Sequence, residues 1–399
     1  MHNEKASLDS RKNAYYAILL LGIVSLMGDV VYEGSRGIIP SYLELLGATA
    51  FIISFVGGLG DFLGYVFRLV SGFLVDATRA YWLFVFLGYG LIVAIPLLGI
   101  PLGLEVAIVL ILTERLGKAF RSPSRDTILS VISRDVGAGK AFGIHELLDQ
   151  IGAILGPIIV TFLMLFTANY NVTLSFLFIP FLALMAVLAY TYKKIGSKTV
   201  PVEPQKTEMR RAALPKVFYF YTFAVLLNTV GLLPYTIILL KASEILKPTG
   251  GEWLAPLIYL LIQGVDAPTA LAAGFAYDKF GLKVLFMPFM LSLLPPLLVM
   301  GSLDLTVIVV AAVFFGLVLG MQESIYRAAV SKFTPVSSRG AAYGIFNTAY
   351  GVGFLINGAV YGLMVDLRAP YLSVVLYALL TQAAATLLLL NASSKITQK

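Results

Sequence analysis

The chain consists of long apolar runs separated by short polar stretches. One run reads TLSFLFIPFLALMAVLAYTY (173–192) and another reads LTVIVVAAVFFGLVLG (305–320). A helix needs about 20 mostly apolar residues to cross a bilayer. The strands of a membrane barrel are shorter, about 10 residues, and alternate apolar with polar positions, a pattern that this sequence does not show. The runs therefore predict an all-α polytopic membrane protein.

The polar breaks divide the chain into twelve predicted transmembrane helices. They cover residues 14–46, 49–76, 81–100, 104–133, 138–167, 171–193, 215–247, 253–278, 282–301, 304–333, 338–367 and 370–391. Several are longer than the bilayer requires, so we expect them to tilt or to protrude. We also expect a bend in the first helix near Pro40.

Composition supports a membrane protein and excludes several other classes. The chain is 59% hydrophobic and 13% charged, whereas soluble domains carry about 25% charged residues. It has no cysteine, which rules out disulfides and thiolate ligands. It has no phosphate-binding Gly-Lys-Ser/Thr segment and no nucleophile–base or metal-ligand set of the usual spacing. We therefore expect no enzyme, no cofactor, no bound metal and no nucleic-acid partner.

The basic residues predict the orientation of the chain. Nineteen of the 29 Lys and Arg residues fall at the termini and in the even-numbered gaps between helices, and three (Lys241, Lys247 and Arg368) fall on the opposite side. Basic loops of membrane proteins stay in the cytoplasm. The bias predicts a multi-pass protein of a cell membrane, inner or plasma, with both termini in the cytoplasm, and we expect a monomer.

The two halves of the sequence are related. GFLVD (72–76) recurs as GFAYD (274–278), and AFGIHELLDQIG (141–152) recurs as AYGIFNTAYGVG (342–353). A polar stretch rich in Lys, Glu and Pro separates the halves. We expect an N-terminal six-helix bundle (1–193), a cytoplasmic linker (194–214) and a pseudo-symmetric C-terminal six-helix bundle (215–399).

These motifs resemble those of the major facilitator superfamily. GFAYDKFGLK (274–283) matches its loop signature, Gly-x-x-x-Asp-Arg/Lys-x-Gly-Arg/Lys-Arg/Lys, whereas GFLVDATRAY (72–81) lacks the second glycine and the final basic pair. GAILGP (152–157) is similar to the core motif of the antiporters. The segments RLGKAFRSPSRD (115–126) and AFGIHELLDQIGAILGP (141–157) look most like a prokaryotic subgroup whose substrates are unassigned. The resemblance implies the twelve-helix transporter fold and alternating access for a small-molecule substrate. It implies gating roles for Gly72, Asp76, Gly274, Asp278, Lys279, Gly281, Gly152, Gly156 and Pro157.

Charged residues within the predicted helices follow helical spacing. Asp29, Glu33 and Arg36 are spaced i, i+4, i+7, which places them on one stripe. Glu114, Lys118, Arg121 and Arg125 form a stripe of the fourth helix, and His145 and Asp149 lie one turn apart on the fifth. Such groups are costly in a bilayer and normally face a wet cavity or a partner. We predict proton coupling by Asp29, Glu33, Asp149 and His145, and substrate binding by Arg36, Tyr32, Lys118, Arg121, Arg125 and Glu146.

Two interpretations of these charges remain open. They form fixed ion pairs that join helices, or some carboxyl groups lose their basic partner in one conformation and take up a proton. Whichever of Asp29 and Glu33 does not pair with Arg36 is the better proton carrier. The favoured function is proton-coupled antiport that exports a small amphipathic or anionic organic solute. The alternatives are a divalent-metal exporter of the same fold and a non-transporting membrane sensor or lipid-handling scaffold.

Overall fold

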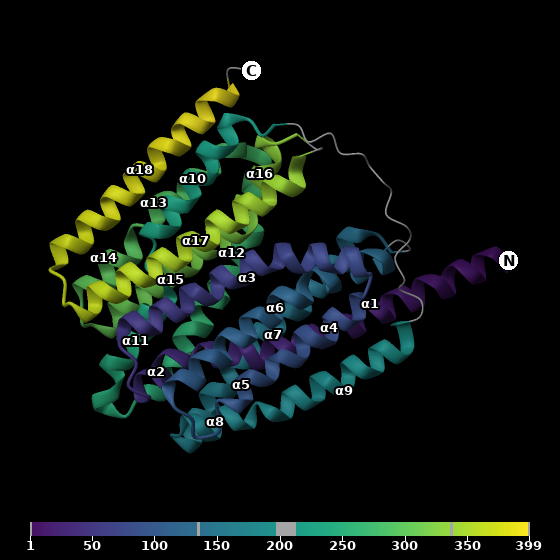
Figure 1. Cartoon of the computed structure of the whole chain (residues 1–399), viewed down its shortest axis with the longest axis horizontal. Helices are drawn as coiled ribbons and strands as arrows, with labels where there is room; N and C mark the ends of the chain where they lie inside the picture. Colours follow the sequence, from purple (N-terminus) through teal and green to yellow (C-terminus); the bar gives the residue numbers. More distant parts are fainter. Residues whose placement is uncertain (1, 134–135, 197–212, 336–337, 398–399) are drawn as a thin grey trace. The chain divides into compact units, whose positions relative to one another are not determined.

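The computed structural model describes residues 2–133, 136–196, 213–335 and 338–397 (Figure 1). Throughout this part of the chain, the regular structure is helical. Most of the predicted linker, residues 197–212, lies outside the described residues, as does Arg134.

The first six predicted helices are all present. They correspond to α1 (His2–Arg36) with α2 (Ile39–Leu45); α3 (Ala50–Thr78); α4 (Tyr81–Gly90) with η1 (Leu91–Val93) and α5 (Ala94–Leu97); α6 (Leu104–Ile132); α7 (Ala138–Thr167); and α8 (Tyr170–Phe176) with α9 (Phe178–Ile195).

The last six are present as well, which confirms the predicted count. They correspond to α10 (Lys216–Gly231) with α11 (Tyr235–Leu246), η4 (Lys247–Thr249) and η5 (Glu252–Leu254); α12 (Ala255–Phe280); η6 (Gly281–Leu285) with α13 (Phe286–Leu291) and α14 (Leu294–Gly301); α15 (Leu305–Met321) with the π-helical turn η7 (Gln322–Tyr326) and α16 (Arg327–Phe333); α17 (Arg339–Asp366); and α18 (Tyr371–Thr397).

The outer faces of these helices require lipid. In the described residues, nine helical stretches are long and apolar enough to cross a membrane, and one of them, Glu252–Gly301, holds two predicted spans. The stretch Tyr371–Ser394 has a mean hydropathy of 2.0, but only 28% of its most apolar window is buried. Phe166 on α7 is 81% exposed. Apolar surface of this extent is unstable in water, so these faces lie against acyl chains.

Two predicted spans differ from the rest. Tyr81–Leu97, which consists of α4, η1 and α5, is shorter than the other apolar stretches. The helix α6 is long, but it carries the predicted charged stripe and is therefore less apolar than the other spans. A long helix with so many charges is stable in a bilayer only if those charges are paired or enclosed.

The first span breaks close to the predicted bend. Helix α1 ends at Arg36, and α2 begins at Ile39 with Pro40 in its first turn. Proline fits a first helical turn because its missing N–H has no intrahelical partner there. The break itself lies at Gly37, where an added methyl group would come within 2.8 Å of the Cα atom of Pro256.

The contacts of the chain group it into two compact units. The first unit comprises Met1–Arg36 and Phe67–Lys206, and the second comprises Gly37–Val66 and Thr207–Lys399. The predicted bundles follow chain order, whereas these units follow contacts, so α3 is divided between the units after Val66. The assignment of six helices to each bundle remains a prediction.

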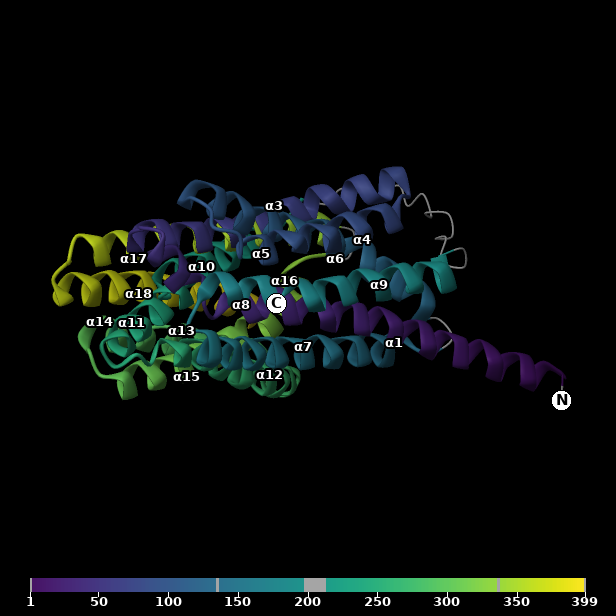
Figure 2. The ribbon, with the colours of Figure 1, turned by 90° about the horizontal axis from the view of Figure 1, so that it is seen from below.

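In the first unit, α1 lies along α7 (Figures 1 and 2). Glycines allow this approach. A methyl group at Gly156 would lie 2.7 Å from the Gly34 nitrogen and from the Val30 oxygen, and one at Gly152 would lie 2.9 Å from Cβ of Asp29. Close packing through small residues is typical of helices in membranes. The two glycines of the antiporter-like motif thus bring α7 against the charged stripe of α1.

In the second unit, aromatic side chains from α10, α13, α17 and η7 form a buried core. Tyr221, Phe289, Tyr326 and Phe346 are all fully buried there. The Tyr221 ring stacks on Phe346 with centroids 5.8 Å apart. This core supports the uncharged polar network described below.

Candidate functional site

The two carboxylates of the stripe on α1 differ, because in the described part of the chain one of them forms an ion pair and the other does not. The Arg36 Nη1 atom lies 2.8 Å from Oε1 and 3.0 Å from Oε2 of Glu33. Asp29, one turn earlier, is 9% exposed and makes no ion pair with any residue that the structure describes. Of the two acids, Glu33 is therefore the partner of Arg36, and Asp29 is the candidate proton carrier.

Tyr32 is surrounded by cations. The Arg36 and Arg121 guanidinium carbons lie 5.2 and 5.0 Å from the centroid of its ring, and the Lys118 ammonium lies 4.9 Å from it. Cations are attracted to the face of an aromatic ring at these distances, more strongly when desolvated. Tyr32 therefore holds positive charge from α1 and α6 in one place without neutralising it.

Lys118 is the most accessible of these cations. Its side chain is 33% exposed, and its ammonium is 3.9 Å from Oε1 of Glu33. The Arg121 side chain is only 3% exposed, and its Nη2 atom is 3.8 Å from Oε1 of Glu114. Arg115 approaches the other oxygen of Glu114 at 3.8 Å. Glu114 thus lies in a structural ion-pair group, while about a third of the Lys118 side chain is accessible.

Arg125 connects three helices. Its Nη1 atom donates to Oγ of Ser25 on α1 at 2.9 Å and lies 3.5 Å from Oδ2 of Asp149 on α7. Its Nε donates to Asp126 on its own helix at 3.0 Å. His145 places Nδ1 3.6 Å from the same Asp149 oxygen. The predicted His145–Asp149 face therefore meets the basic stripe of α6.

Two members of this site were not predicted. Oγ of Ser25 also bonds to the hydroxyl of Tyr89 at 2.9 Å, and the Tyr89 ring packs under the Arg121 guanidinium at 5.2 Å. Helix α4 approaches α6 closely here, since a methyl group at Gly88 would lie 2.6 Å from the Gly117 oxygen. Neither Ser25 nor Tyr89 is charged at neutral pH, so sequence alone offers only the position of each on a helix next to the charged stripes.

Glu146 lies outside the cluster. It is exposed, and its contact is with Gln150 of its own helix, whose Nε2 donates to Oε1 at 3.3 Å. His145 and Glu146 are successive residues of one helix and point in different directions. The structure therefore brings together the other predicted coupling and substrate residues, but not this one.

The loop-signature residues lie at or near helix ends. Asp76, Asp278 and Lys279 are exposed. Gly281 has a φ of 64° and ends α12. The position that corresponds to it in the first copy is Arg79, which also has a positive φ, 56°, after the end of α3. The positive φ of the signature is therefore kept where its second glycine is not.

The second unit contains a buried network of uncharged polar groups. Asn228 on α10 donates to Gln382 on α18 at 2.8 Å and to Ser292 at 3.1 Å, and it accepts from Tyr326 in η7 at 2.7 Å. Gln322 donates to Asn228 at 3.1 Å and accepts from Tyr350 on α17. These groups were not predicted, because none of them carries a charge.

Among the described residues, no three His, Cys, Asp or Glu side chains are placed to hold a metal ion. What the cluster of α1, α6 and α7 can do chemically is hold a proton on a buried carboxylate and bind an anionic group at Lys118. A bundle of membrane-spanning helices with ionisable groups gathered at such a site defines a polytopic transporter.

The chain belongs to the major facilitator superfamily, whose sequence profile matches residues 18–358. It is 35% identical over 374 residues, 92% of this chain and 91% of the relative, to an uncharacterized protein of Mycobacterium tuberculosis. It is 26% identical over 360 residues, 88% of this chain and 87% of the relative, to an uncharacterized transporter of this superfamily from Methanocaldococcus jannaschii.

Solved structures share the fold. A variant of the nucleoside transporter NupG aligns with a TM-score of 0.71 at 16% identity, covering 95% of this chain and 99% of that one. A variant of the peptide transporter POT aligns with a TM-score of 0.73 at 15% identity, covering 95% and 94%. These likenesses show the fold alone. Membership of the superfamily makes the chain a multi-pass membrane protein and a secondary transporter rather than an enzyme.

Proposed function

We propose that the protein is a proton-coupled antiporter that exports a small amphipathic or anionic organic solute. The observation that carries the proposal is the unpaired, buried Asp29 beside paired Glu33 and accessible Lys118. A buried carboxylate without a counter-ion is costly when charged. Protonation removes that cost, and a cationic surface nearby remains available to a solute.

Competition between the proton and the solute for Asp29 explains how the protein exchanges one for the other. The anionic group of a solute binds Lys118, and a hydrogen-bond donor of the same solute binds the carboxylate of Asp29 once its proton has left. Proton and solute then exclude each other at one site, as antiport requires. The ion pair of Arg125 with Asp149 joins α6 to α7 and transmits the change of charge between those helices.

Export, the antiporter-like subgroup and the cell-membrane orientation with cytoplasmic termini belong to this proposal. They are supported by GAILGP on α7 and by the bias of basic residues toward one side. We also propose that the monomer is the working unit, since the carboxylates and cations of the cluster all come from one chain.

The test uses proteoliposomes that contain a pH-sensitive dye. Aromatic carboxylates, amphipathic cations and divalent metal salts are added separately, with an imposed pH gradient. We expect an organic anion to move protons in the direction opposite to its own movement. Proton movement elicited by a metal alone indicates the divalent-metal exporter instead, and no flux with any gradient indicates a sensor or scaffold. Movement of anion and proton in the same direction overturns antiport.

A further inference from the structure

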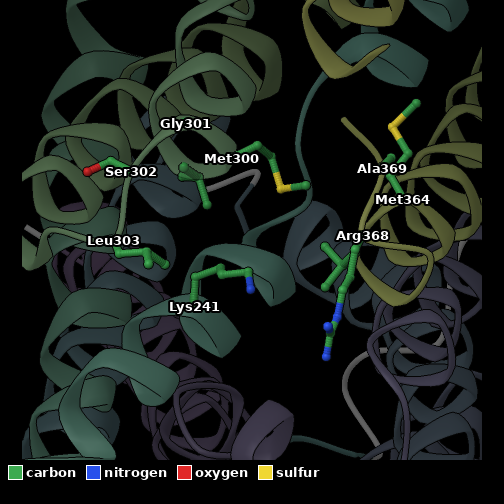
Figure 3. Close-up of a pocket in the computed structure, with 10 residues that line it drawn as sticks. Lys241, Met300, Gly301, Ser302, Leu303, Met364, Arg368 and Ala369 are labelled. Carbon is green, nitrogen blue, oxygen red and sulfur yellow. The ribbon is translucent and has the colours of Figure 1, made fainter. Parts of the chain in front are cut away.

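A pocket of about 280 Å³ opens in the second unit where α17 ends and α18 begins (Figure 3). Its walls come from the middle of α11, from the end of α14 with the α14–α15 connection, and from the end of α17 with the α17–α18 connection. Drug-sized ligands occupy pockets of about 300–1,000 Å³. The volume therefore suits a head group or a small ion rather than a complete exported solute.

Two cations enter this pocket from different segments. Figure 3 shows the Lys241 ammonium and the Arg368 guanidinium extending from two different segments toward the same opening. Leu303 and Met364 add apolar wall. Two cations on an apolar surface suit an anionic group that carries a short apolar chain.

The backbone of Arg368 gives independent support. Arg368 has a φ of 50°, its N–H donates to Val365 at 3.0 Å, and the N–H of Ala369 donates to Met364 at 2.9 Å. These are the two bonds of a Schellman motif, whose left-handed position is usually glycine. A side chain there is unfavourable, and strained positions of this kind cluster at ligand clamps. Arg368 therefore holds an unfavourable backbone conformation at the wall of the pocket.

The two cations differ in availability. Lys241 Nζ lies 2.6 Å from Oε2 of Glu244, which does not line the pocket. The Arg368 side chain makes no hydrogen bond or ion pair with any described residue. An incoming anion therefore meets an available guanidinium first and then competes with Glu244 for the lysine.

We propose that this pocket binds the anionic head of an amphiphile, a phosphate or carboxylate on an apolar chain. The head bonds bidentately to Arg368 and accepts a hydrogen bond from Lys241, while the first carbons of the chain contact Met300 and Leu303. The molecule that carries this head is either a membrane phospholipid or a free organic anion, since both have this chemistry. The site shares no residue with the cluster on α1, α6 and α7 and does not depend on antiport.

Octyl phosphate is the probe, titrated calorimetrically into the full-length protein in a neutral maltoside detergent. We expect Lys241→Met and Arg368→Gly each to weaken binding at least tenfold. Lys247→Met is the matched control, because Lys247 lies just after α11 but does not line the pocket. Glu244→Gln should strengthen binding, since it removes the competitor for Lys241. Equal affinity in all five proteins, or no binding by the wild type, overturns the proposal.

Thermal unfolding without ligand separates this role from a structural one. Glycine fits the left-handed position, so Arg368→Gly should raise the Tm while it abolishes binding. If the arginine serves only as a cation at the end of α17, the variant should lower the Tm and leave binding unchanged. That second result contradicts the proposal.

Native mass spectrometry identifies the source. The protein is released from nanodiscs that contain phosphatidylglycerol or phosphatidylcholine. Retention of phosphatidylglycerol by the wild type, and not by Arg368→Gly, indicates a lipid headgroup. Octyl phosphate binding without lipid retention indicates a free anion. If the wild type neither binds octyl phosphate nor retains phosphatidylglycerol, the pocket is not an anion site.

Discussion

At the scale of residues, neighbouring acids on one stripe have different surroundings. Glu33 accepts two contacts from Arg36 and one from Lys118, whereas Asp29 forms no ion pair within the described residues. An ion pair lowers the tendency of a carboxylate to take up a proton, and burial without one raises it. Spacing placed both acids on the same face, but only the three-dimensional positions of the cations distinguish their roles.

Replacing Asp29 tests the proton site directly. Asp29→Asn keeps the size of the side chain but removes the titrating group, so we expect solute-driven proton movement in proteoliposomes to fall to background. Solute binding, measured by calorimetry, should weaken but stay measurable, because the solute loses the carboxylate of Asp29 and keeps its contact with Lys118. The matched control is Glu146→Gln, an exposed acid of α7 that should keep full coupling. Wild-type coupling in Asp29→Asn would falsify the assignment.

Glu33 should behave differently from Asp29. Glu33→Gln leaves Arg36 without its carboxylate partner in a part-buried position. Breaking a buried pair costs about 3–5 kcal/mol, and we expect a loss toward the lower end of this range because Arg36 keeps its contact with the Tyr32 ring. The measurement is the Tm in detergent. A lower Tm for Glu33→Gln than for Asp29→Asn is expected, and the reverse order contradicts the pairing described above.

At the scale of elements, the glycines of α7 have distinct surroundings. A methyl group at Gly152 would meet the Leu26 oxygen of α1 and lie 2.9 Å from Cβ of Asp29, whereas one at Gly143 would meet nothing within 4 Å. The antiporter-like motif thus has a packing role in this chain. It sets how closely the carboxylates of α1 and α7 approach one another.

This difference predicts opposite effects for the same substitution. Gly143→Ala should stabilise the protein by about 0.5–1 kcal/mol, because alanine is the better helix former and has space. Gly152→Ala should destabilise it by about 1–3 kcal/mol, the usual cost of overpacking, and should slow transport. Tm and initial transport rate measure the two effects. Equal Tm values for the two variants would show that α1 and α7 do not pack tightly at Gly152.

The structure of single elements was predictable from sequence to different extents. The spans followed from apolar length, and the break near Pro40 followed from helix chemistry. Arg79 could not be predicted to adopt a positive φ, since that conformation normally requires glycine. Ser25 and Tyr89 join the site only because α1, α4 and α6 cross there. Neutral residues carry no charge signal, and a crossing depends on contacts between segments distant in sequence.

At the scale of the whole molecule, α3 belongs to the first sequence repeat, but its residues 50–66 pack with α17 of the second. A methyl group at Gly358 would lie 3.0 Å from the carbonyl carbon of Ser54, and one at Gly362 would lie 2.7 Å from Cα of Phe51. Asp366 accepts hydrogen bonds from the N–H groups of Ala50 and Phe51 at 2.9 and 3.1 Å. The repeats are therefore joined along a glycine seam capped by one carboxylate.

If the repeats move apart during transport, this seam must open, and Asp366 should set how often it does. Losing a helix cap costs about 0.5–2 kcal/mol, and one or two kcal/mol changes a population ratio by about 5–30-fold. The chain has no cysteine, so a spin-label pair at Leu45→Cys and Leu367→Cys, both exposed positions, reports the seam without background. We expect Asp366→Ala to shift the distances toward a longer, broader population.

The control for this measurement is Asp304→Ala. Asp304 also caps a helix, accepting from the N–H of Thr306 at 2.7 Å, but that bond is local to α15. The substitution Asp304→Ala should lower the stability of α15 and leave the distances between the spin labels at the seam unchanged. A shift of equal size in both variants means that Asp366 affects the seam only through general destabilisation. A shift confined to Asp366→Ala means that the cap itself holds α3 against α17, and that its free energy biases the equilibrium on which transport depends.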